Sequence, residues 1–236
     1  MGASDQLSPG PAAVKLSDGQ AVAEAIVVVD VVESTTTIDR YGWEAEGRIL
    51  FQDLRHLIAT VSENRGLRCR KSTGDGYLLT YGNERDADIG VIDAVNASFD
   101  LLGQIAEHNA NVRVQQTMDV RIAVHFGQVY VVERVVEVGP PVVVERDREG
   151  PNVSLTFRLE GIRDADVEEA VDHMATAEFP LRNYVICSQQ VKTIVERRSP
   201  NTFSFRHVGL FRLKGFENAR YDVYLITRGL GDPSTL

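Results

Sequence analysis

The chain has 236 residues, of which 25 are Lys or Arg and 34 are Asp or Glu, so its net charge is −9. This acidic balance argues against nucleic-acid binding, which needs clustered basic side chains to contact phosphates. No apolar run approaches the roughly 18 residues of a membrane-spanning helix, and the N-terminus lacks an apolar signal segment. The two cysteines fit neither a metal-binding spacing nor a disulfide framework. We therefore expect a cytoplasmic protein that binds neither nucleic acid nor a membrane.

The pattern predicts one domain between two short tails. Residues 1–20 are rich in Gly, Ser, Pro and Ala, a composition that is typical of a disordered segment. Residues 21–228 alternate between strand and helix patterns, with no internal repeat. Residues 229–236 form a short C-terminal tail, so a single catalytic or binding domain is expected over 21–228.

The first half of this domain alternates between strand and helix patterns. An apolar, β-branched run over residues 23–30 predicts a strand that is buried on both faces. Serine and threonine at 34–37 predict the start of a helix, whose free backbone amides suit a phosphate. Apolar residues spaced three and four apart predict two amphipathic helices, over residues 42–64 and 87–108.

A Gly-Asp-Gly turn stands between these two helices. The Gly74–Gly76 turn separates two β-compatible runs and predicts a tight hairpin over residues 67–81, because glycine accepts the positive φ that such a turn needs. The hairpin holds the Asp75 carboxylate at its tip, and the first predicted strand ends in another carboxylate, Asp30. We expect the two carboxylates to face each other and to form a two-metal site for phosphoryl chemistry.

The second half predicts an α/β continuation. β-branched and alternating apolar residues predict further strands, over residues 120–125, 128–138, 142–144, 184–187, 203–208 and 221–226. Apolar spacing predicts further helices, over residues 152–162, 165–177 and 188–195. The order predicts an α+β fold with a ferredoxin-like split β-α-β-β-α-β arrangement, helices on one face of the sheet, and additional C-terminal α/β elements.

Five short motifs resemble, in order, those of the catalytic domain of class III nucleotidyl cyclases, over residues 24–226. They are Asp30–Thr35, Lys71–Asp75, Arg121–Gly127, Gly150–Leu159 and Leu213–Gly215. Each motif alone is weak, but five in the family's order make a specific signal. The resemblance implies an enzyme that converts a nucleoside triphosphate into a 3′,5′-cyclic nucleotide and pyrophosphate.

The resemblance implies a role for the residues around the first motif. Asp30 and Asp75 are implied to hold two divalent ions, Mn²⁺ or Mg²⁺, and the Val31 carbonyl adds a ligand, since hard oxygen ligands suit these ions. Ser34 and Thr35 belong to the loop whose amides are implied to hold the phosphates. The plain alternative is that both aspartates are ordinary turn residues.

The fourth motif carries the remaining implied catalytic residues. Arg158 matches the family arginine that stabilises negative charge on the reacting phosphate, a role that suits a permanently charged guanidinium. Ser154 stands at the position of the asparagine that orients the ribose, and offers one donor where the amide offers two. In this family the metal aspartates and the arginine of one site come from different subunits. The resemblance therefore implies an antiparallel homodimer with two composite sites.

The choice of base stays open between two interpretations. Lys71 and Asp147 match the pair with which purine-selective members read the base, which implies ATP and cyclic AMP. Against this, the segment 127–150 is longer than the family pattern, and the charged run 145–149 has the composition of a solvated turn. The isolated domain and Ser154 instead resemble the pyrimidine cyclases of bacterial antiphage Pycsar systems. We therefore expect a manganese-dependent enzyme that makes cyclic UMP, before cyclic CMP, for a separate effector.

Two functions of other kinds are weighed beside these. An inactive pseudocyclase that senses nucleotides would keep the fold, but Asp30, Asp75, Lys71 and Arg158 are all present, and only Ser154 departs from the catalytic set. A diguanylate cyclase would need a Gly-Gly-(Asp/Glu)-(Asp/Glu)-Phe turn, which this hairpin lacks. Nucleotide cyclisation is the function that the residues favour.

Overall fold

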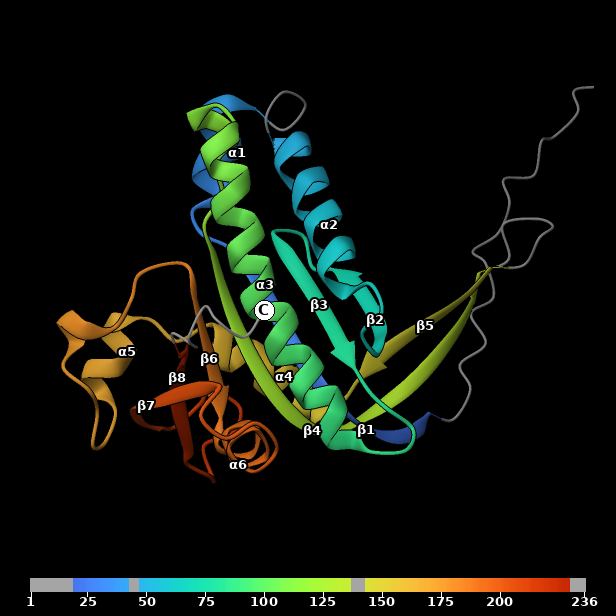
Figure 1. Cartoon of the computed structure of the whole chain (residues 1–236), viewed down its shortest axis with the longest axis vertical. Helices are drawn as coiled ribbons and strands as arrows, with labels where there is room; N and C mark the ends of the chain where they lie inside the picture. The colour runs from blue at the N-terminus through green and yellow to red at the C-terminus, as the bar shows by residue number, and fades with distance from the viewer. Residues whose placement is uncertain (1–18, 43–46, 137–142, 230–236) are drawn as a thin grey trace, which may run out of the picture.

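The computed structural model of the chain describes residues 19–42, 47–136 and 143–229 (Figure 1). The tails predicted at 1–20 and 229–236 lie almost wholly outside the described residues. The described residues fold into one β-sheet with helices packed against it.

Strands and helices alternate along the chain. The strands are β1 (Gln20–Val31), β2 (Leu67–Ser72), β3 (Gly76–Tyr81), β4 (Val120–Val136), β5 (Val143–Glu149), β6 (Tyr184–Ser188), β7 (Phe203–Phe211) and β8 (Tyr221–Arg228). The α-helices are α1 (Ser34–Tyr41), α2 (Arg48–Ser62), α3 (Ala87–Asn111), α4 (Pro151–Glu160), α5 (Asp164–Glu169) and α6 (Gln189–Arg198). Two short 3₁₀ helices are η2 (Val114–Gln116) and η3 (Thr176–Glu178).

All of these strands form one sheet of eight strands. The order along the sheet is β2-β3-β1-β4-β6-β8-β7, and β5 pairs with the far part of β4. Its first four strands, β2-β3-β1-β4, have the order of a split β-α-β-β-α-β unit, and β6, β7 and β8 extend the sheet. β4 and β6 run parallel, whereas the other pairs are antiparallel. The predicted α+β fold with C-terminal additions is confirmed.

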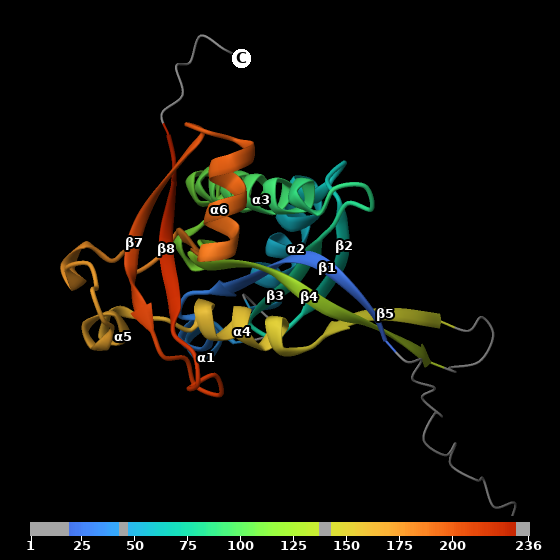
Figure 2. The same ribbon diagram turned by 90° about the horizontal axis from the view of Figure 1, so that it is seen from below.

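Helices cover both faces of the sheet, so the prediction of helices on one face was wrong. Helices α2, α3 and α6 pack on one face, and α4 lies on the opposite side of β1 and β4 (Figure 2). The alternation of β1 explains this arrangement. Val27 and Val29 belong to the core beneath α2 and α3, while Ile26 and Val28 pack with Val153 of α4. β1 is thus buried on both faces, as predicted.

β4 is one long strand where two were predicted, over 120–125 and 128–138. Gly127, at the expected break, stays in register opposite Glu24 of β1. A Cβ added at Gly127 would lie 2.5 Å from Cγ of Asn152, which is at the start of α4. The glycine therefore lets α4 approach the strand closely and does not make a turn.

The helix predicted over 165–177 is shorter than expected. It ends at Glu169, because the backbone of Val171 pairs with Leu210 of β7, with N–O distances of 3.2 and 2.9 Å. This pairing holds the segment after α5 against the sheet edge. The periodicity of the sequence continued past the point where a long-range contact ends the helix.

Among the described residues, one helix, α3, is long and apolar enough to cross a membrane by length and composition. Its buried residues, including Val91, Ala94 and Leu101, belong to the core that α3 shares with the sheet and α2. A helix packed inside a protein passes the same test of length and composition.

The packing of the hairpin against β1 can be tested by a substitution at Gly76. A Cβ at this position would lie 2.0 Å from the carbonyl oxygen of Val29, so Gly76→Ala must push β3 away from β1. We expect a loss of about 3 kcal/mol or more in the free energy of unfolding, measured by urea denaturation.

Gly103→Ala is the matched control, because nothing lies within 4 Å of its Cβ position on the exposed side of α3. That change should stabilise the protein by about 0.5–1 kcal/mol, since alanine favours a helix over glycine. Equal effects of the two substitutions would contradict the packing argument.

Candidate functional site

The structure places Asp30 and Asp75 on one cavity. Asp30 is opposite Gly76 in the β1–β3 ladder, and the N–H of Val31 donates to the carbonyl oxygen of Asp75 at 3.1 Å. The hairpin itself is closed by a bond from the N–H of Thr73 to the carbonyl of Gly76, at 3.0 Å. Because Gly76 has no side chain, the tip of the hairpin lies directly against the end of β1.

This cavity, of about 420 Å³, has a charged lining from four parts of the chain. Three carboxylates face it: Asp30 from β1, Asp75 from the hairpin and Glu160 from α4. Two guanidinium groups, of Arg121 at the start of β4 and Arg163 after α4, lie among them. We call these five residues the carboxylate–arginine cluster.

The two aspartates of this cluster have different surroundings. The Asp30 side chain is 15% exposed and accepts a hydrogen bond from Nη2 of Arg121, its neighbour across the β1–β4 ladder. Nη2 of Arg163 lies 4.0 Å from the same carboxylate. The side chain of Asp75 is exposed and has no hydrogen-bond or ion-pair partner among the described residues. One carboxylate is therefore occupied by cations of the chain, and the other is free.

Glu160 is the third carboxylate of the cluster, with 10% of its side chain exposed. Its Oε1 lies 3.1 Å from Nη2 of Arg163 and 3.3 Å from Nε of Arg121. Burial raises the pKa of Glu160, and the charge of Asp30 raises it further, against the opposing effect of the two arginines. Sequence reasoning missed Glu160, Arg121 and Arg163, although the pairing of the first strand with the third motif would have placed Arg121 opposite Asp30.

The segment after β1 begins a helix beside the cavity. Val31 is buried at the end of the strand, and α1 starts at Ser34, which is buried, followed by the exposed Thr35. Ser34 and Thr35 are not among the residues that line the cavity. Glu33 precedes them with a φ of 55°, in the left-handed region that favours glycine. The chain therefore turns sharply between Asp30 and the first amides of α1.

Lys71 and Asp147 meet in the structure, from β2 and β5. The ammonium group of Lys71 donates to Oδ2 of Asp147, whose side chain is 9% exposed. The other oxygen, Oδ1, accepts the backbone N–H of Arg148 at 2.8 Å. The run 145–149 is thus strand β5, and its interpretation as a solvated turn was wrong.

Two charged residues of β5, Asp147 and Arg148, are buried because they find partners on other strands. Arg148, next to Asp147, forms a double hydrogen bond with Glu24 of β1, at 2.8 and 2.9 Å. Both side chains of this pair are at least nine-tenths buried. A charged run looks solvated when only its own composition is considered, since both partners, Glu24 and Lys71, lie far away in the sequence.

Ser154 and Arg158 lie outside the carboxylate–arginine cluster. Both are exposed on α4, and neither lines the cavity of Asp30 and Asp75. Arg158 instead lines a second cavity, of about 520 Å³, between the α4–α5 segment, the end of β7 and the connection from β7 to β8. A single chain therefore does not bring Arg158 to the two aspartates.

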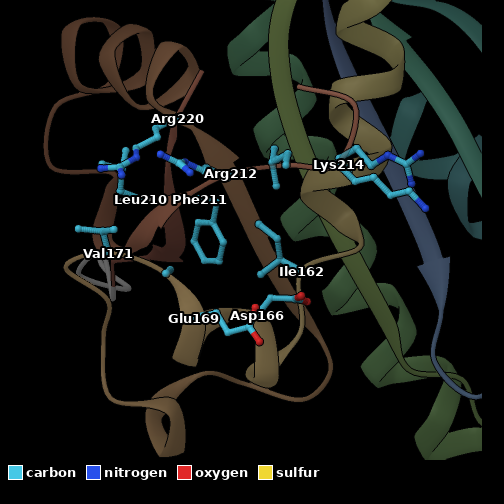
Figure 3. A pocket seen from close by; sticks show the side chains of 12 residues that line it. Ile162, Asp166, Glu169, Val171, Leu210, Phe211, Arg212, Lys214 and Arg220 are labelled. Atoms are coloured by element: carbon cyan, nitrogen blue, oxygen red, sulfur yellow. The ribbon is translucent and has the colours of Figure 1, made fainter. Parts of the chain in front are cut away.

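The second cavity, which we call the cationic cleft, contains four basic residues: Arg158, Arg212, Lys214 and Arg220. Figure 3 shows Arg212 and Arg220 close together at one end of the cleft, Lys214 toward the other, and Asp166 and Glu169 across from them. Among the described residues, none of the four cations has a hydrogen-bond or ion-pair partner. This cleft is suited to an anion.

His125, within the third motif, supports α4 rather than lining either cavity. Its Nδ1 is 2.8 Å from Oγ of Ser188 and its Nε2 is 3.0 Å from Oδ1 of Asn152. Asn152 also donates to the carbonyl of Gln128, at 2.8 Å. Burial lowers the pKa of His125, which favours the neutral ring at neutral pH.

Comparison with known proteins identifies the fold. No family model and no curated protein sequence matches the chain. Solved structures do match: the adenylyl cyclase CyaB from P. aeruginosa has 14% identity and a TM-score of 0.68, covering 92% of this chain and 99% of that chain. The guanylyl cyclase Cya2 has 20% identity and a TM-score of 0.67, covering 93% and 98%.

A third match is the guanylate cyclase domain of RhGC from Catenaria anguillulae in complex with GTP, with 15% identity, a TM-score of 0.64, and coverage of 91% and 99%. At these identities the likeness concerns the fold. The chain has the fold of class III adenylyl and guanylyl cyclase catalytic domains, over nearly the whole length of each, as its motifs indicated.

The buried pair of Glu24 and Arg148 can be tested by stability. Glu24→Gln leaves the Arg148 guanidinium buried without its counter-charge, so we expect a loss of about 3–5 kcal/mol in the free energy of unfolding, measured by urea denaturation.

Glu133→Gln provides the control, because Glu133 pairs with Arg146 on the same two-stranded ribbon with side chains 40% and 69% exposed. Its loss should cost no more than about 1 kcal/mol. A loss for Glu24→Gln as small as that for Glu133→Gln would show that Arg148 is not held as described.

Proposed function

We propose that the chain is a nucleotidyl cyclase, which converts a nucleoside triphosphate into a 3′,5′-cyclic nucleotide and pyrophosphate. The observation that carries the proposal is the shared cavity of Asp30 and Asp75, on a chain with the cyclase fold. The complex of the Catenaria anguillulae domain with GTP agrees with a nucleoside triphosphate as the substrate class.

Asp30 and Asp75 are the proposed ligands of two divalent ions, Mn²⁺ or Mg²⁺, with the Val31 carbonyl as a further ligand. Among the described residues no group of three or more His, Cys, Asp or Glu side chains is arranged to hold a metal by itself. Two carboxylates that leave further positions to phosphate and water are nevertheless the donor set that suits these ions. Bound there, the ions lower the pKa of the ribose 3′-hydroxyl and neutralise the triphosphate.

The separation of Arg158 from the aspartates supports a composite site. In an antiparallel homodimer, Arg158 and Ser154 of one subunit face the nucleotide held by Asp30 and Asp75 of the other. The cationic cleft then lies toward the phosphates, and its unpaired charges suit them on a chain whose net charge is −9. Amides at Ser34 and Thr35, which open α1, are the proposed contacts to the outer phosphates.

Lys71 and Asp147 form the proposed base-reading pair. Together they offer a donor next to an acceptor, and several bases present the complement: O4 and N3–H in uracil, or N1 and the N6 amino group in adenine. Ser154 and the long β4–β5 ribbon favour a pyrimidine, as in the Pycsar resemblance, whereas the contact between Lys71 and Asp147 favours adenine. UTP is our first candidate, ahead of CTP, and ATP is the alternative. A separate effector that responds to cyclic UMP would place the enzyme in antiphage signalling.

The substrate is identified by incubating the purified protein with all four nucleoside triphosphates and Mn²⁺, and by analysing the products by mass spectrometry. We expect cyclic UMP as the main product. Asp30→Asn or Asp75→Asn should lower turnover by about 100-fold or more, because each removes a metal ligand.

Thermal unfolding shows whether these variants keep their fold. Turnover retained in Asp30→Asn or in Asp75→Asn would contradict the assignment of these residues as metal ligands. The absence of pyrophosphate with all four substrates would leave a nucleotide-sensing pseudocyclase.

The composite site is tested by mixing two inactive variants, Asp75→Asn and Arg158→Ala. Their heterodimer has one site with both residues intact, so exchange of subunits should restore about a quarter of the wild-type turnover, as expected for a symmetric dimer mixed at random. A mixture as inactive as its components would indicate that each site is built within one chain.

The base-reading pair is tested by Lys71→Gln and Asp147→Asn. Either change should alter the ratio of kcat/KM among the four triphosphates by about tenfold, since each removes a charged hydrogen bond to the base. Arg146→Gln, an exposed change on the same strand, is the control. An equal loss of rate with all four substrates would show that the pair supports the site without reading the base.

A further inference from the structure

In the carboxylate–arginine cluster, Asp30 is paired with arginine, and this pairing opposes the binding of a metal ion. Within it, Asp30, Glu160 and Arg121 are 15%, 10% and 16% exposed, and Arg163 is 35% exposed. Both arginines contact the same oxygen of Asp30, Oδ2, so a divalent ion that takes this oxygen competes with them. The exchange costs least if Arg121 has another carboxylate to turn to.

We propose that Glu160 is a positioning residue that takes over the guanidinium of Arg121 when Asp30 binds a divalent ion. The inference rests on the proposed two-metal function, and concerns residues that this function leaves without a role.

The contacts of Arg121 show where it would turn. Its Nη2 donates to Asp30, while its Nε is buried and has no hydrogen-bond partner, although Oε1 of Glu160 is only 3.3 Å away. The ion pair of Nε with Glu160 is thus already formed, but it falls short of the hydrogen bond that a buried N–H needs. A small rotation toward Glu160 would turn this ion pair into a hydrogen bond and draw the guanidinium away from Asp30.

The contacts of Glu160 leave one of its oxygens open to Arg121. Arg163 holds it in place by an ion pair to Oε1, at 3.1 Å, and is itself anchored on the backbone oxygens of Glu160 and Ile162. Both of the contacts of Glu160 use Oε1, so its second oxygen is available to a second guanidinium. Glu160 thereby keeps two arginines close to the site without taking oxygens from the ion.

The charges explain why this exchange matters. Without an ion, two arginines balance Asp30 and Glu160. When an ion binds Asp30, it repels the nearby guanidinium groups, and Glu160 is the carboxylate of the cluster that remains beside both of them. A neutral side chain at position 160 would leave Asp30 as the one anionic partner of Arg121 and strengthen its competition with the ion.

The test is to measure Mn²⁺ binding to the full-length protein without nucleotide. The electron paramagnetic resonance signal of free Mn²⁺ reports how much of the ion remains unbound. Glu160→Gln should raise the Kd by about tenfold, the size of effect that residues supporting metal ligands have. The double variant with Arg121→Met and Glu160→Gln should have a Kd within about twofold of the wild-type value, because it lacks the guanidinium that competes with the ion.

Glu168→Gln on the exposed side of α5 is the control for the change in net charge, and should leave the Kd unchanged. Glu160→Asp, which keeps the negative charge, should retain most of the affinity. Thermal unfolding of each variant checks its fold, and Arg121→Gln also removes the competing charge if Arg121→Met does not fold.

The outcomes separate this inference from the proposed function. An effect of Glu160→Gln no larger than that of Glu168→Gln would overturn the inference. Weak binding that persists in the Arg121→Met and Glu160→Gln double variant would overturn it as well, and would make Glu160 a metal ligand itself. Wild-type binding that is absent, or that Asp30→Asn leaves unchanged, would instead remove the metal assignment on which the inference depends.

Discussion

The close approach of the hairpin tip to the first strand is the constraint on which the site depends. Gly76 lies so near the carbonyl of Val29 that no side chain fits between them. This contact is why a carboxylate at the end of β1 and a carboxylate at the tip of the hairpin reach the same cavity. The glycine is therefore required for more than the turn: it sets the distance between two strands at the point where the chemistry is proposed to occur.

The two cavities have opposite character, and this difference organises the proposed enzyme. One contains three carboxylates with two arginines among them. The other contains two carboxylates and four cations, and these cations have no hydrogen-bond or ion-pair partner among the described residues. Ions and phosphates need both kinds of charge at one place, yet a single chain keeps them on separate surfaces. The proposed antiparallel dimer would resolve this separation, because it would place the cationic cleft of one subunit against the aspartates of the other.

The sequence predicted the parts of the structure that depend on local pattern. The Asp75 hairpin and the strand ending at Asp30 follow from turn chemistry and apolar runs. The order of the first four strands of the sheet follows from the succession of elements. The errors came from contacts between distant residues. Gly127 looked like a break in a strand until Asn152 was found packed against it, and Asp147 looked solvated because its partner Lys71 is 76 positions away. The sequence did not predict that Arg121 and Glu160 belong to the site, because this depends on which strands and helices are neighbours.

The cluster around Asp30 also bears on the stability of the chain without ions. Three carboxylates in one cavity repel one another, and burying Asp30 or Glu160 unpaired would destabilise the fold. Arg121 and Arg163 offset this cost when no ion is present. If the site holds metal ions as proposed, it must allow one kind of cation to replace the other. Both arginines contact Oε1 of Glu160, and Nε of Arg121 lies beside it without a full hydrogen bond, so this is where the proposed replacement would occur.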